Sequence, residues 1–229
     1  MNGFDDGDVY TAADVPDIYK HSFDPYVCNG GSIVAIAGED FVTIAGDTRM
    51  VNEDDAIVSR SQSKLFQLTP MTAIGSVGCF ADTLAVVNVI KQNIHMYQLT
   101  HLKRISTDAL AQMLSISMYS HRFFPYFVSN IVAGIDRNGK GAVFSYDPIG
   151  HHERKAYDAA GTGFELMIPA MDYFIKNLKE PLTIEIAAEI TRKVMIVADN
   201  KDVYTGDSAI MYIITKNGVE AKKMPLRKD

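Results

Sequence analysis

Residues 29–50 read NGGSIVAIAGEDFVTIAGDTRM, and this stretch decides the fold. Two runs rich in Val, Ile and Ala, Ser32 to Ala37 and Phe41 to Ala45, flank a three-residue connection that contains a glycine. Runs of this kind are typical of a hairpin whose two faces are both buried. The hairpin begins after two glycines and ends on Asp47 and Arg49. The sequence therefore predicts a buried hairpin with charged residues beside a glycine pair.

Three further hairpins are predicted along the chain. Each pairs two β-rich runs across a turn that contains Pro or Gly, and such turns reverse the chain direction. A weaker strand is expected between the last two hairpins. The runs are 64–68 with 72–77, 127–135 with 142–146, and 209–215 with 219–223, and the weaker strand is 153–159.

Four helices are predicted between the hairpins from apolar residues at helical spacing. The first begins near Asp82, which we expect to cap the free backbone N–H groups of that helix. Ser106 starts the second, and Thr183 caps the fourth. The third covers 164–178 and contains Pro169, which is expected near its first turn or at a kink.

The order of these elements is hairpins, two helices, hairpins, two helices and a closing hairpin. Strands apolar on both sides need cover on both faces, and two stacked sheets with a helical layer outside each provide it. We therefore expect an α+β fold, a four-layer αββα sandwich. Residues 23–229 form a single domain in this interpretation, and residues 1–22, which carry five Asp residues, form a polar leader.

Composition excludes several classes of function. The formal net charge is -6, with Lys and Arg scattered, which disfavours nucleic-acid and anionic-membrane surfaces. The two cysteines, Cys28 and Cys79, have no metal-binding or disulfide-framework spacing, and His151 and His152 are adjacent and so point apart. No apolar run is long enough to span a membrane. We expect no metal, no cofactor and a reducing compartment.

Five motifs occur in an order that resembles the beta subunits of the 20S proteasome, members of the N-terminal nucleophile hydrolase superfamily. The resemblance runs from about Phe23 to the C-terminus, and it implies the αββα fold of that superfamily. The motifs are Gly30-Gly31-Ser32-Ile33, Ala45-Gly46-Asp47-Thr48-Arg49, Gly78-Cys79-Phe80-Ala81-Asp82, Gly161-Thr162-Gly163 and Asp202-Val203-Tyr204-Thr205-Gly206.

The resemblance implies a site that lacks its nucleophilic residue. Active members of the family begin with a Thr whose hydroxyl attacks a peptide carbonyl and whose own amino group helps to move the proton. Gly30 occupies that position here, and a slip of one residue would place Gly31 there. The family's other site residues fall on Asp47, Lys64, Thr162 within Gly161-Thr162-Gly163, Asp202 and Thr205.

We therefore expect a chain with no catalytic residue, in which these vestigial positions hold loops together because a buried Lys and Asp are stable when paired. One alternative is an active N-terminal serine hydrolase in which processing exposes Ser32, which N-terminal sequencing of the mature chain tests. A second alternative is a self-sufficient homo-oligomeric binding protein, which native mass measurement tests.

The subunit type is also suggested by resemblance. The segments 23–27, 122–126, 139–143 and 226–229 look most like the sixth beta type, which is non-catalytic. This implies a hetero-oligomer of 28 chains with the fifth and seventh beta types as ring neighbours, contacts to the alpha ring and to the opposite beta ring, and a cytoplasmic and nuclear location. The leader would be trimmed by neighbouring active sites near residues 21–23.

Overall fold

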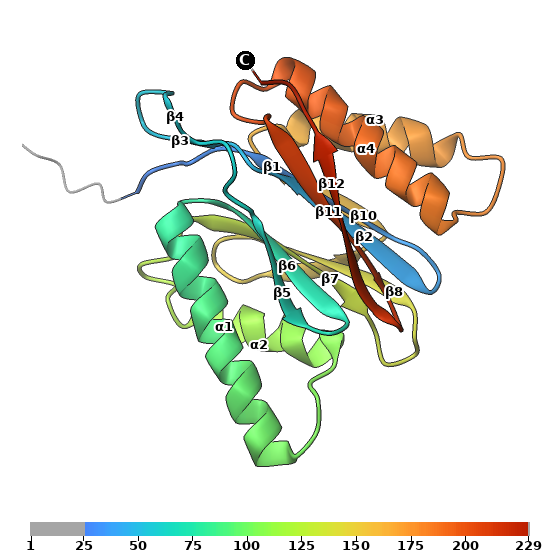
Figure 1. Cartoon of the computed structure of the whole chain (residues 1–229). Helices are drawn as coiled ribbons and strands as arrows, with labels where there is room; N and C mark the ends of the chain where they lie inside the picture. Colours follow the sequence, from blue (N-terminus) through green and yellow to red (C-terminus); the bar gives the residue numbers. More distant parts are fainter. Residues whose placement is uncertain (1–25, 229) are drawn as a thin grey trace, which may run out of the picture.

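Two five-stranded antiparallel sheets pack face to face in the computed structural model, which describes residues 26–228 (Figure 1). A pair of helices covers the outer face of each sheet, so the predicted α+β four-layer αββα sandwich is confirmed. The first sheet has the strand order β10-β1-β2-β11-β12. Its strands are β1 Ser32–Ala37, β2 Phe41–Asp47, β10 Tyr157–Gly161, β11 Ser208–Thr215 and β12 Gly218–Pro225.

The second sheet follows the chain order β5-β6-β7-β8-β9. A separate two-stranded ribbon lies near the start of β1. The strands of the second sheet are β5 Leu65–Thr69, β6 Thr72–Gly78, β7 Val128–Ile135, β8 Gly141–Tyr146 and β9 His152–Lys155, and the ribbon is β3 Met50–Val51 with β4 Ile57–Ser59. The helices are α1 Phe80–His101, α2 Thr107–Tyr119, α3 Phe164–Lys176 and α4 Ile184–Lys201.

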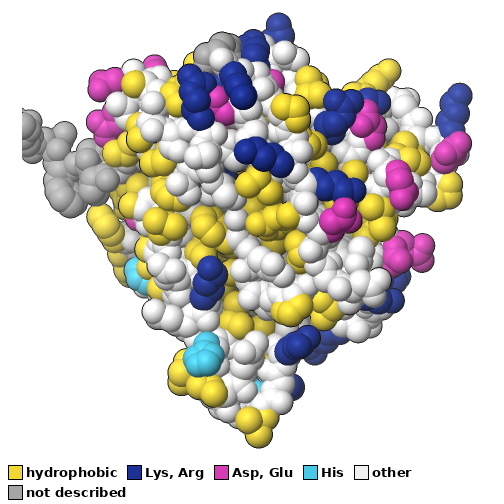
Figure 2. All heavy atoms as spheres, in the orientation of Figure 1, with side chains coloured by type: hydrophobic (Ala, Val, Ile, Leu, Met, Phe, Trp, Pro, Cys, Tyr) yellow, Lys and Arg dark blue, Asp and Glu magenta, His cyan; other side chains and the backbone are white. Residues whose placement is uncertain are grey.

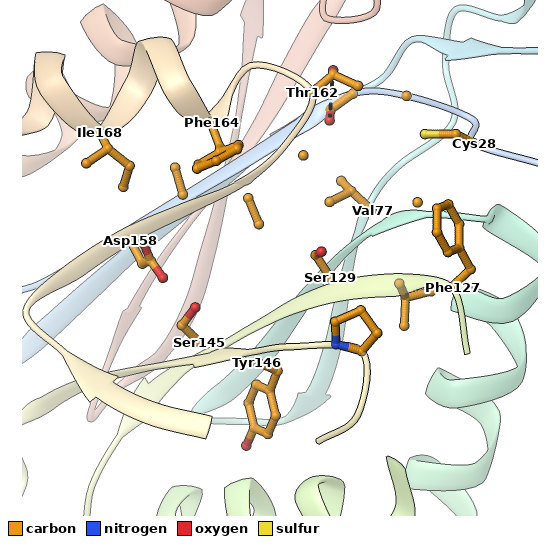
Figure 3. Close-up of a pocket in the computed structure, with 18 of the residues that line it drawn as sticks. Cys28, Val77, Phe127, Ser129, Ser145, Tyr146, Asp158, Thr162, Phe164 and Ile168 are labelled. Carbon is orange, nitrogen blue, oxygen red and sulfur yellow. Dashed lines mark hydrogen bonds between the residues drawn. The ribbon is translucent and has the colours of Figure 1, made fainter. Parts of the chain in front are cut away.

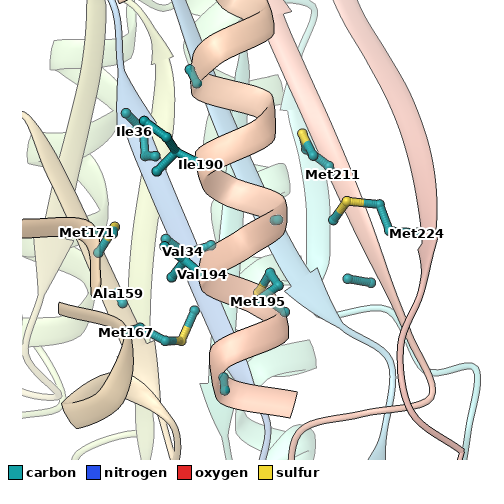
Figure 4. Close-up of a cluster of buried hydrophobic side chains, with 14 of the residues drawn as sticks. Val34, Ile36, Ala159, Met167, Met171, Ile190, Val194, Met195, Met211 and Met224 are labelled. Carbon is teal, nitrogen blue, oxygen red and sulfur yellow. The ribbon is translucent and has the colours of Figure 1, made fainter. Parts of the chain in front are cut away.

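The hairpin of β1 and β2 lies in the middle of the first sheet and is buried on both faces, as its sequence predicts. Alternate side chains, such as Ile33 and Ile44, face the second sheet and join the inner core. The intervening side chains, such as Val34 and Ile36, meet Ile190 and its neighbours on α4 (Figure 4). Burial on both sides explains why the two runs lack the alternation of a half-exposed strand.

Two of the predicted elements need correction. The run 153–159 is not one strand: it is divided at Ala156 into β9, an edge of the second sheet, and β10, an edge of the first. Asp82 does not cap α1, which begins at Phe80; its carboxylate Oδ2 accepts a hydrogen bond from Phe127 N at 2.8 Å instead. Both errors arise because local sequence does not show which sheet or loop a segment meets.

The predicted caps of α2 and α4 are confirmed. Ser106 Oγ accepts a hydrogen bond from Ala109 N, and Thr183 Oγ1 accepts one from Ile186 N. Within residues 26–228, no helix combines the length and the apolar character that crossing a bilayer requires. On the face drawn in Figure 2, Lys and Arg side chains are interspersed with acidic and apolar ones. The leader predicted for residues 1–22 lies outside the described residues.

Removing the cap of α2 is expected to destabilise the chain measurably. Ser106→Ala leaves the Ala109 N–H without its acceptor and also removes the acceptor of Arg137 Nε at 3.0 Å. We expect the free energy of unfolding of the full chain to fall by about 1 kcal/mol in urea denaturation. Ser120→Ala, an exposed serine at the other end of α2, is the control and should change it by less than about 0.5 kcal/mol. Equal losses would contradict the capping role.

Candidate functional site

The glycine pair at the head of β1 adopts a backbone conformation that disfavours side chains. Gly30 has φ +68° and Gly31 has φ +90°, both in the left-handed region. A Cβ on Gly31 would lie 2.2 Å from Lys64 Nζ and 2.6 Å from Asp47 Oδ1. A Cβ on Gly30 would lie 2.8 Å from Tyr204 Cβ. As the chain is folded, neither position has room for the side chain of a nucleophile.

Asp47 and Lys64 form a buried ion pair between the two sheets. Asp47 ends β2 in the first sheet, and Lys64 directly precedes β5 in the second. The Lys64 Nζ to Asp47 Oδ1 distance is 2.9 Å, and the side chains are 5 % and 0 % exposed respectively. Lys64 Nζ also donates to the Arg49 carbonyl. The ammonium group therefore lies directly beside Gly31, where the side chain of residue 31 would have to stand.

The Asp47 carboxylate is surrounded by hydrogen-bond donors. Besides Lys64, Ser32 N donates to Oδ1 at 2.8 Å and Arg49 N to Oδ2 at 3.1 Å. Burial raises the pKa of Asp47, while the nearby Lys64 ammonium and these N–H groups oppose the shift. The ionised form of the buried Asp47 carboxyl therefore depends on Lys64.

A second network joins the predicted loop residues to β1. Asp202 Oδ2 accepts hydrogen bonds from Thr162 Oγ1 at 2.5 Å and from Thr205 Oγ1 at 2.6 Å. Ser32 Oγ lies 2.8 Å from Thr205 Oγ1 and accepts a hydrogen bond from Gly163 N at 2.9 Å. Because the Ser32 side chain is fully buried, its hydroxyl serves to join the loops around β1.

Gly161, the remaining predicted position, ends β10 beside the glycine pair. It has φ +105°, and a Cβ there would lie 2.0 Å from the carbonyl oxygen of Gly31. The structure thus brings all the predicted site residues together at the head of β1. They are Gly30, Asp47, Lys64, Gly161, Thr162, Gly163, Asp202 and Thr205.

Asn29 is a site residue that the sequence pattern did not reveal. Its N donates to the Gly78 carbonyl at 2.9 Å, and its side-chain amide donates to the Val51 carbonyl at 2.9 Å. Its Oδ1 accepts from Phe80 N at 2.8 Å, and its carbonyl oxygen from Val51 N at 3.2 Å. Four hydrogen bonds hold the chain directly before Gly30, and a polar residue beside two glycines was the only signal in the sequence.

Asp207 was also missed, although it binds two arginines. Arg49 Nε donates to Asp207 Oδ2 at 2.9 Å, and Arg60 Nη1 to Oδ1 at 2.5 Å. Arg49 Nη1 donates in addition to the Val203 carbonyl at 2.7 Å. Arg49, which sequence places beside Asp47, therefore anchors the loop that carries Asp202 and Thr205.

The site can bind and position chain segments, but none of the predicted site residues presents a free hydroxyl. At the head of β1 the two backbone positions carry no side chain, and the hydroxyls of Ser32, Thr162 and Thr205 are engaged in hydrogen bonds. Among residues 26–228, no cluster of three or more His, Cys, Asp or Glu is placed to hold a metal ion. A pocket of about 640 Å³ adjoins the glycine pair.

A comparison of the sequence with known protein families shows which family the chain belongs to. The family model described as "Proteasome subunit" matches residues 27–214, which include every site residue named above. The chain belongs to the proteasome subunit family. The αββα sandwich described above is therefore of the N-terminal nucleophile hydrolase type, as the sequence resemblance implied.

The similar curated proteins show that the chain is a beta subunit of the 20S core. "Proteasome subunit beta type-1" of Drosophila melanogaster is 51 % identical over 223 residues and covers 94 % of each chain. "Proteasome subunit beta type-1-B" of Carassius auratus is 42 % identical, with 92 % of this chain and 91 % of the relative covered. "Probable proteasome subunit beta type-6" of Schizosaccharomyces pombe is 38 % identical, with 92 % and 99 % covered. The relatives thus carry two different type numbers.

Proposed function

We propose that this beta subunit is non-catalytic: it builds the inner ring of the 20S core and leaves peptide hydrolysis to other subunits. The observation that carries the proposal is the pair Gly30 and Gly31, which offers no hydroxyl where attack would begin. Lys64 fills the space beside Gly31, and its ammonium is paired with Asp47. The resemblance places Lys64 and Asp47 in the family's site, but neither residue 30 nor residue 31 carries a hydroxyl for them to act on.

The finer assignment is the sixth beta type. Sequence segments 23–27, 122–126, 139–143 and 226–229 support it, as does the name of the Schizosaccharomyces pombe relative. On this proposal the subunit lies between the fifth and seventh beta types in a particle of 28 chains, contacts the alpha ring and the opposite beta ring, and shapes a neighbour's substrate cleft. Its location is cytoplasmic and nuclear. Cross-linking of the assembled particle should join this chain to those two neighbours.

The competing function is hydrolysis by Ser32 after cleavage of the preceding bond. Ser32 is buried within β1, its N donates to Asp47, and its Oγ contacts Thr205 and Gly163. Using it as an N-terminal nucleophile requires cutting the chain that Asn29 anchors and freeing Oγ from its contacts with Thr205 and Gly163. The geometry therefore favours the non-catalytic function.

Treating the assembled particle with a peptide epoxide tests the proposal. We expect the intact mass of this chain to be unchanged while chains with an N-terminal hydroxyl nucleophile gain the probe mass. N-terminal sequencing should place the mature start near residues 21–23, ahead of Asn29. Probe attached to residue 30, 31 or 32, or a mature chain beginning at Ser32, would contradict a non-catalytic role.

A further inference from the structure

The pocket beside the glycine pair lies between the two sheets, and Lys64 is not among its lining residues. It has a volume of about 640 Å³, within the range of roughly 300–1,000 Å³ that small-molecule sites occupy. Strands from both sheets form its floor and walls, and α3 contributes at one side (Figure 3). The larger apolar side chains around it include Val77, Phe127, Pro148, Phe164 and Ile168.

Two hydroxyls point into this pocket from the second sheet. Figure 3 shows the side-chain oxygens of Ser129 on β7 and Ser145 on β8 directed into the space. Neither side-chain hydroxyl has a hydrogen-bond partner among residues 26–228. Each can therefore donate to and accept from a bound group without breaking an existing bond.

The charges at the pocket cancel. Among the described lining residues only Lys155 and Asp158 are charged, and Lys155 Nζ lies 3.1 Å from Asp158 Oδ2. The Asp158 side chain is 9 % exposed, so a ligand that separated this pair would leave a largely buried carboxylate without its cation. The pocket therefore disfavours a ligand of either charge.

We propose that this pocket binds an uncharged aromatic group that carries a hydroxyl. An aromatic ring can pack against Phe127 or Phe164, since aromatic pairs gain energy beyond the area that they bury. A hydroxyl on the ring can hydrogen-bond to the free oxygen of Ser129 or of Ser145, which gives orientation and selectivity. The group can belong to a free small molecule or to a tyrosine of a peptide.

Cys28 provides a reporter at the pocket. It is exposed and lines the pocket, whereas Cys79 is buried. A trifluoromethyl thiol reagent should therefore label Cys28 in the full chain, and Cys28→Ser should remove the label. Fluorine NMR of the labelled chain is then followed during titration with p-cresol, N-acetyl-tyrosinamide, N-acetyl-phenylalaninamide and N-acetyl-aspartamide, the last of which carries a carboxylate.

We expect saturable shifts with p-cresol and N-acetyl-tyrosinamide and none with N-acetyl-aspartamide. Equal affinity for the first two indicates a free small molecule as the ligand, and tighter binding of the tyrosinamide indicates a peptide. The phenylalaninamide should bind about fivefold to tenfold more weakly than the tyrosinamide, because it lacks the hydroxyl.

Two variants locate the binding. Ser145→Phe fills the pocket and should weaken binding at least about tenfold, whereas Ser120→Phe, at the exposed end of α2, should leave it unchanged. Replacing Ser129 and Ser145 together by alanine makes only a small change in volume and should abolish the preference for tyrosinamide over phenylalaninamide. Absence of saturable binding, binding that survives Ser145→Phe, or a preference that survives the double change would overturn the proposal.

Discussion

Replacing Lys64 with methionine is expected to lower the free energy of unfolding of the full chain by about 3–5 kcal/mol. The change keeps most of the side-chain volume and removes the ammonium that pairs with Asp47 at 2.9 Å. Asp47 is fully buried, and its remaining donors are backbone N–H groups such as that of Ser32. Loss of Lys64 therefore leaves a buried carboxylate whose charge is only partly compensated. Chemical denaturation measures the loss directly.

Two further variants separate the ion pair from other effects of the change. Asp47→Asn combined with Lys64→Met removes both charges, and we expect it to recover a large part of the loss, because the cost arises from the unpaired charge. Arg192→Met removes a cation from the exposed pair with Glu189 and should cost less than about 1 kcal/mol. A Lys64→Met loss as small as that of Arg192→Met would show that the buried pair does not hold the sheets together.

The fold was readable from the sequence because its strongest signals are local. The apolar runs of β1 and β2 indicate a two-sided buried hairpin, and the hydroxyls of Ser106 and Thr183 mark helix starts. The division of 153–159 was not readable, since both halves have strand-like sequence and only tertiary packing assigns them to different sheets. The ribbon of β3 and β4 was missed because strands of two and three residues carry almost no periodicity.

The site was predictable to a different degree. The family resemblance predicted Asp47, Lys64 and Asp202 as site residues, and the structure brings them to one end of β1. Asn29 and Asp207 act through contacts with residues far away in the sequence, such as Phe80 and Arg49. No periodicity or spacing encodes such contacts. Only the structure shows that Asn29 holds the chain before Gly30 and that Asp207 holds the loop after α4.

Restoring a hydroxyl at the glycine pair is expected to destabilise the chain without creating an enzyme. In Gly31→Thr the new Cβ would lie 2.2 Å from Lys64 Cε and Nζ, and the backbone φ of +90° disfavours a β-branched residue. Accommodating the side chain moves Lys64 away from Asp47, so we expect a loss of at least about 3 kcal/mol in the free energy of unfolding. We also expect no reaction with a peptide epoxide in the assembled particle, because Gly30 precedes the residue and its nitrogen is a peptide nitrogen, not a free amino group.

Gly218→Thr is the matched control for this change. Gly218 also has a positive φ, +127°, but a Cβ there would meet nothing within 4 Å. It should therefore show backbone strain alone, about 1–3 kcal/mol. The difference between the two variants measures the collision with the Asp47–Lys64 pair. If Gly31→Thr is as stable as Gly218→Thr, or if the epoxide labels residue 31, then the Asp47–Lys64 pair can accommodate a nucleophile. Either result would contradict a purely structural role for the site.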